Sequence, residues 1–144
     1  MIEQDTIKLL RECDAGVKMG VSSIEDVIDS VKSDEMKKYL QQCKAEHDKL
    51  DTEIQQELDR FGDEGKDPNP MAKGMSWIKT NVKMAFSGSD ETIADLMTDG
   101  CNMGVKSLNK YLNEYEAADE KSKDIAKRLI NLEERLAIDI RQYL

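Results

Sequence analysis

The feature that most constrains the fold is a spacing of three and four residues between apolar side chains, which continues along nearly the whole chain of 144 residues. One stripe comprises Leu10, Cys13, Val17, Ile24, Val27 and Val31, and the next comprises Met36, Leu40, Cys43, His47, Leu50, Ile54, Leu58 and Phe61. Alternating steps of this size are typical of amphipathic helices packed in a bundle. The pattern therefore predicts an all-α protein.

Capping residues divide this pattern into helices. Ser33 precedes Asp34 and Glu35, which suits a helix N-cap followed by an acidic first turn. Gly62 directly follows the second stripe and suits the position after a helix C-terminus, and Ser89 can cap a third helix. Because the link around Ser33 is short, we expect the first two helices to be antiparallel neighbours.

An internal repeat relates the two halves of the chain. Segments 16–24 and 100–108 carry identical residues (Gly, Met, Gly, Val and Ser) at five positions with an offset of 84. At an offset of 86, the ladder of Leu50, Ile54 and Leu58 falls on Leu136, Ile140 and Leu144. The repeat predicts two similar helical hairpins.

We expect one domain over residues 1–144, with hairpins at about 2–61 and 90–144. The connection over 62–89 is long enough to return along the bundle, which would make the second and third helices parallel. Within it, Asn69-Pro70 begins an apolar pattern that ends near Phe86 and predicts a short crossover helix.

Two hairpins, a long crossover that carries Trp77, and glycines in the middles of the first and third helices resemble the ferritin-like superfamily. More narrowly, the chain resembles an uncharacterised bacterial family within it. The resemblance implies a ferritin-like antiparallel four-helix bundle, with a short crossover helix between helices 2 and 3. It also implies a homodimer, because ferritin-like bundles commonly pair through their long helices, but it implies no assigned activity.

The residues argue against the metal centre of that superfamily. A di-iron site usually takes a Glu from each of two helices and Glu-x-x-His from each of the other two. This chain has one histidine, His47, with Lys44 three residues before it, and Glu133 stands at the corresponding place of the fourth helix. The middles of the first and third helices carry Gly20 and Gly104. We therefore expect no metal centre and no cofactor.

An atypical metal site remains as an alternative. Cys43 and His47 are four residues apart and share one helix face, and Cys13 or Cys101 could approach from a neighbouring helix to complete a zinc or copper site. The other interpretation makes His47 a hydrogen-bonded structural residue of the core. We expect no enzymatic activity, since this pair lacks a third orienting group and oxyanion donors.

Candidate binding residues are the glycine pairs Gly16 and Gly20, and Gly100 and Gly104, together with Trp77. Glycines four residues apart let another backbone or a large side chain approach, so the pairs predict tight packing of the first and third helices. A small-molecule cleft or a dimer contact between these helices is the alternative. Leucine in place of Gly20 should then overpack the bundle and lower its stability by at least about 1 kcal/mol.

Charge and composition narrow the classes of partner. The chain has 30 acidic against 21 basic residues, a net charge of −9, which argues against nucleic acid binding. Residues 66–86 are locally basic (+3) and either pack on the acidic bundle or dock on a partner, with too little charge for stable membrane attachment.

No apolar run reaches the length of about 20 residues that spans a membrane, the N-terminus lacks a secretory signal, and three widely spaced cysteines suit a reducing cytoplasm. The sequence alone leaves the function unknown. The leading hypothesis is a non-catalytic cytoplasmic bundle that acts through self-association or partner binding. The alternatives are a ferritin- or rubrerythrin-like metal protein for iron storage or oxidoreduction, and a small-molecule carrier that uses the bundle interior.

Overall fold

A computed structural model describes residues 2–65 and 89–144 of the chain. Its elements are the helices α1 (Ile2–Ile28), α2 (Asp34–Arg60), α4 (Asp90–Glu114) and α5 (Glu120–Asp139), and the 3-10 turn η2 (Ile140–Tyr143). The predicted all-α fold with four long helices is confirmed. The predicted crossover helix, the basic segment 66–86 and Trp77 lie outside the described residues.

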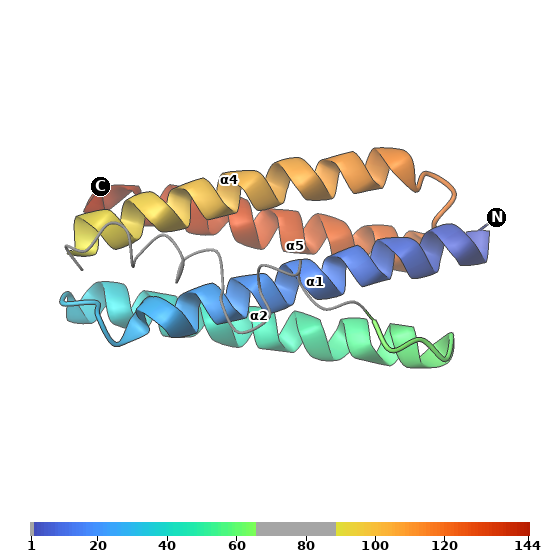
Figure 1. The fold of residues 1–144 in the computed structure, drawn as a ribbon, viewed down its shortest axis with the longest axis horizontal. Helices are drawn as coiled ribbons and strands as arrows, with labels where there is room; N and C mark the ends of the chain where they lie inside the picture. The colour runs from blue at the N-terminus through green and yellow to red at the C-terminus, as the bar shows by residue number, and fades with distance from the viewer. Residues whose placement is uncertain (1, 66–88) are drawn as a thin grey trace.

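The helices form two antiparallel hairpins, α1 with α2 and α4 with α5, that pack side by side (Figure 1). The backbone amides of Lys32 and Ser33, before α2, donate to the carboxylate of Asp90 in the first turn of α4 at 2.8 and 2.9 Å. At the opposite end, the amide of Asp119 donates to the hydroxyl of Thr6. The second and third long helices therefore start at the same end of the bundle and run parallel, as the sequence predicts.

Local hydrogen bonds explain where the helices begin and end. The Ser33 hydroxyl accepts from the amide of the third residue after it, and Ser89 and Asp119 cap α4 and α5 in the same way. After α2, Gly62 has a φ of +65° and donates its amide to the carbonyl of Asp59, while Asp63 donates to that of Leu58. This is a Schellman motif. The caps predicted at Ser33 and Ser89 and the stop at Gly62 are confirmed.

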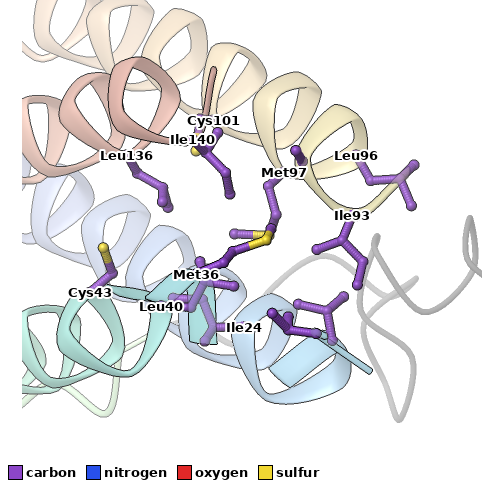
Figure 2. Packing of buried hydrophobic residues seen from close by; sticks show 13 residues of the cluster. Ile24, Met36, Leu40, Cys43, Ile93, Leu96, Met97, Cys101, Leu136 and Ile140 are labelled. Atoms are coloured by element: carbon purple, nitrogen blue, oxygen red, sulfur yellow. The ribbon is translucent and has the colours of Figure 1, made fainter. Parts of the chain in front are cut away.

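The described residues form two apolar clusters in the interior, one toward each end of the bundle. The first contains Ile24, Val27, Val31, Met36, Leu40, Cys43, Ile93, Ala94, Leu96, Met97, Cys101, Leu136 and Ile140. The second contains Leu9, Leu10, Cys13, Val17, Leu50, Ile54, Leu58, Leu108, Ala118, Ile125, Ala126, Leu129 and Ile130. Figure 2 shows part of the first cluster, in which Met36 of α2 and Met97 of α4 point toward one another. All four helices contribute to each cluster, so the hairpins share one interior.

Within residues 2–65 and 89–144, no helix is both long enough and apolar enough to cross a membrane.

Candidate functional site

A polar layer separates the two apolar clusters in the middle of the bundle. Each helix contributes one residue to it: Gly20 from α1, His47 from α2, Gly104 from α4 and Glu133 from α5. Along its own helix, each of these residues falls between a member of the first cluster and a member of the second. We call these four residues the central layer. Its members occupy the repeat-related positions, since Gly20 and Gly104 are 84 residues apart and His47 and Glu133 are 86 apart.

His47 and Glu133 bind one another directly across the interior. The His47 Nε2 lies 2.8 Å from Glu133 Oε1, and its Nδ1 lies 2.7 Å from the carbonyl oxygen of Cys43, one turn earlier in α2. His47 is 1% exposed and Glu133 is 8% exposed. Burial alone would lower the pKa of His47, but the hydrogen bond to Glu133 and its negative charge outweigh burial and raise that pKa above its usual value. The arrangement favours a charged imidazolium.

The two glycines of the central layer differ in the space that they leave for a Cβ atom beside this pair. A Cβ atom on Gly20 would lie 2.8 Å from Cδ2 and 2.9 Å from Nε2 of His47, which is closer than such atoms pack. A Cβ atom on Gly104 would lie 3.8 Å from Glu133 Oε2, an ordinary contact. These nearest atoms belong to large side chains of α2 and α5, whereas the glycine pairs were expected to mark tight packing of the first helix on the third. Gly20 makes room for the imidazole ring.

Two buried thiols flank the pair. Burial raises the pKa of the Cys43 thiol to about 11, although a hydrogen bond with Tyr39 lowers it. Burial also raises the pKa of the Cys101 thiol, and the charge of Glu133 and a hydrogen bond to it raise that pKa further. The hydroxyl of Tyr39 in turn donates to Asp139 Oδ2 at 2.8 Å. A polar network therefore runs from the central layer to the C-terminal end of α5, and its thiols stay protonated and unreactive.

These residues do not fit the di-metal centre of ferritin-like proteins. Two of the four inward positions are glycines and supply no ligand, while both ring nitrogens of His47 already have partners. Across the described parts of the chain, no group of three or more His, Cys, Asp or Glu residues is placed to hold a metal ion. The predicted zinc or copper candidates, Cys43 and His47, do lie on one buried face, but the His47 ring hydrogen-bonds to Glu133.

The structure places the other candidate residues apart from the central layer. Gly16 lies one turn before Gly20, and a Cβ there would meet Leu129 of α5 at 3.5 Å. Gly100 is half-buried on α4, Cys13 is fully buried in the second cluster, and Trp77 lies outside the described residues. None of the three cysteines is in a disulfide.

A second buried polar group lies between α1 and α2. Asp14 is fully buried and accepts hydrogen bonds from Lys18 Nζ at 3.0 Å and Gln55 Nε2 at 2.6 Å. Burial, together with the neighbouring Asp14, raises the pKa of Asp51. Gly65, with a φ of +85°, packs directly on the Asp14 carboxylate. The start of the connection therefore lies against α1.

Sequence reasoning missed the role of Glu133, and a signal for it was present. In α5 it follows Leu129 by four residues and precedes Leu136 by three, so it occupies a position of the apolar stripe. It also corresponds to His47 at the repeat offset of 86. A carboxylate on the stripe, matched to a histidine on the stripe, indicates a buried pair because an unpaired buried charge is costly.

The geometry defines a class: a four-helix all-α protein of two hairpins with a polar central layer. Residues 5–114 match the model of a family described as a domain of unknown function, DUF2383. Because the match covers most of the chain, this protein belongs to that family. The match contains Gly20, His47 and Gly104 but ends before Glu133. No curated protein and no solved structure matches the chain.

Proposed function

We propose that this chain is a ferritin-like bundle whose metal centre is replaced by a closed His47–Glu133 pair, and that it acts without catalysis in the cytoplasm by associating with itself or with another protein. The observation that carries the proposal is the central layer. If the chain is ferritin-like, the middles of its four helices are where metal ligands would be expected, and here two of these positions are glycines and two bind one another.

The energetics of the His47–Glu133 pair support a structural role for it. Opening it to admit a metal ion at Nε2 of His47 would separate two buried groups held at 2.8 Å. Leaving a buried charge without its partner typically costs about 3–5 kcal/mol. A metal would have to recover that cost with few further ligands, because Gly20 and Gly104 offer none.

Elemental analysis tests the absence of a metal centre. The protein is purified anaerobically, incubated with Fe(II) and Zn(II), desalted and compared with a His47→Ala variant. We expect less than about a tenth of an equivalent of either metal in both proteins. Desalting removes weakly bound metal, whereas a structural metal site would retain it. A stoichiometric metal in the natural protein that is lost in His47→Ala would overturn the proposal and make the Cys43–His47 face the functional site.

The proposed association is a homodimer through the outer face of α4. Met103 is 55% exposed there, in the middle of the helix, whereas the other large exposed apolar residues within 2–65 and 89–144, which are Ile2, Ile138 and Leu144, lie near an end of the sequence. Sedimentation equilibrium should give twice the chain mass of 16.4 kDa at high concentration. Met103→Lys should weaken the dimer, and Asn102→Lys on the neighbouring exposed position serves as control. A mass of 16.4 kDa at every concentration would refute the homodimer.

A further inference from the structure

The partners of His47 determine how many protons the central layer must hold. Both ring nitrogens face oxygen atoms, the Cys43 carbonyl at 2.7 Å and Glu133 Oε1 at 2.8 Å. A carbonyl oxygen accepts hydrogen bonds and cannot donate, and an ionised carboxylate likewise only accepts. A neutral imidazole carries one N–H, so it can satisfy one of these contacts and not both. The geometry therefore requires one proton more than neutral histidine and ionised glutamate provide.

The groups around the pair place this proton on the imidazole. From α4, the Cys101 thiol hydrogen-bonds to Glu133. From α2, Glu46 adds negative charge near His47, and Cys43 contributes its carbonyl and a protonated thiol. From α1, the facing residue is Gly20, which brings no titratable group. The negative groups on α2 and α5 favour the imidazolium.

We propose that the His47–Glu133 pair is a pH-sensitive lock: the pair binds one proton when the protein folds, and it opens when that proton is lost as the pH rises. After the loss, an unprotonated ring nitrogen faces an acceptor oxygen at less than 3 Å in the centre of the bundle. Because the pair touches all four helices, the contact that becomes repulsive lies where both hairpins meet. The lock does not depend on the proposed association.

Urea unfolding as a function of pH tests the lock with two neighbouring variants. Glu133→Gln can donate an amide N–H to a neutral His47 and so satisfies the ring without the extra proton, whereas Glu134→Gln changes an exposed residue of the same helix. A group with a raised folded-state pKa stabilises the fold fully below its unfolded pKa, about 6.5 for histidine, and loses this effect as pH rises through the folded value.

The comparison covers the range from about pH 6.5 to the folded-state pKa. There, each pH unit should raise the unfolding equilibrium constant of Glu134→Gln about tenfold relative to that of Glu133→Gln. All solutions contain a chelator to exclude metal effects. Equal pH slopes in the two variants would overturn the proposal, since the extra proton would then not belong to this pair.

A spectroscopic measurement on the natural protein covers the case in which Glu133→Gln does not fold. Because the chain has a single histidine, its imidazole nitrogen signals need no assignment. As pH is raised, the ring of the folded protein should lose its proton at a higher pH than the ring in concentrated urea, whose pKa is about 6.5. Loss of the proton at the same or a lower pH in the folded protein would contradict the lock.

Discussion

Alanine in place of each central-layer glycine should have opposite effects on stability. Replacing a mid-helix glycine with alanine ordinarily gains about 0.5–1 kcal/mol, because the unfolded chain loses freedom and the helix gains propensity. At Gly104 the new methyl group meets Glu133 at 3.8 Å and fits. At Gly20 it would lie 2.8 Å from the His47 ring, which is held on its other sides by Cys43 and Glu133. The ring must move and strain the hydrogen bonds.

Overpacking of this kind costs about 1–3 kcal/mol, and loss of a hydrogen bond to a charged group adds about 1.5–3 kcal/mol if the ring is displaced far enough. After the gain in propensity, Gly20→Ala should be less stable than the natural protein by up to about 2.5 kcal/mol from overpacking alone, and by about 1.5–5.5 kcal/mol if the hydrogen bond is also lost. Gly104→Ala should be more stable by up to about 1 kcal/mol. Urea titration followed by far-ultraviolet circular dichroism measures both. Equal stabilisation by the two variants would refute the packing argument at Gly20.

Three further predictions test other parts of the molecule. Hydrogen bonding to Arg128 lowers the pKa of Glu53 to about 2, so the bridge between α2 and α5 stabilises the fold above the unfolded pKa of about 4.3 and ceases to do so as pH falls through 2. Glu53→Gln should cost about 0.5–1 kcal/mol at pH 7 and progressively less as pH falls through 2, and equal unfolding midpoints at pH 7 would contradict this. Burial raises the pKa of Cys43 to about 11, and all three thiols are buried. A thiol reagent at pH 8 should therefore modify the cysteines after urea unfolding and hardly at all in the native protein. Rapid labelling of the native protein would argue against the described core. Gly65→Ala should lower stability by about 1–3 kcal/mol through its positive φ and its contact with Asp14, and an unchanged melting temperature would speak against that contact.

The helices could be predicted from the sequence because their signals are local. The apolar stripe sets each buried face, and the caps at Ser33 and Ser89 and the stop at Gly62 depend on residues within one turn. The hairpins and the parallel course of α2 and α4 followed from the short link and the long connection. Predicting these elements did not require knowing which side chains contact one another.

The central layer could be predicted in part. The sequence identified Gly20, Gly104 and His47 as positions of interest, but it treated the glycines as a contact between two helices and compared Glu133 with a metal-ligand pattern. Whether a histidine on an apolar stripe faces a thiol, a metal or a carboxylate depends on the rotation of each helix and on a partner 86 residues away. That information is tertiary, and the sequence carries two signs of it: the place of Glu133 on the apolar stripe and its repeat offset from His47.

The central claim, that His47 is held by Glu133 and the Cys43 carbonyl and is closed to metal, can be tested by recording the imidazole nitrogen spectrum of the natural protein before and after one equivalent of Zn(II). The single histidine makes the signals unambiguous. The account predicts that both ring nitrogens keep their protons and that the spectrum is unchanged by zinc. Loss of the Nε2 proton with a shift that saturates at one equivalent would contradict it, because zinc would then have displaced Glu133 or bound with it.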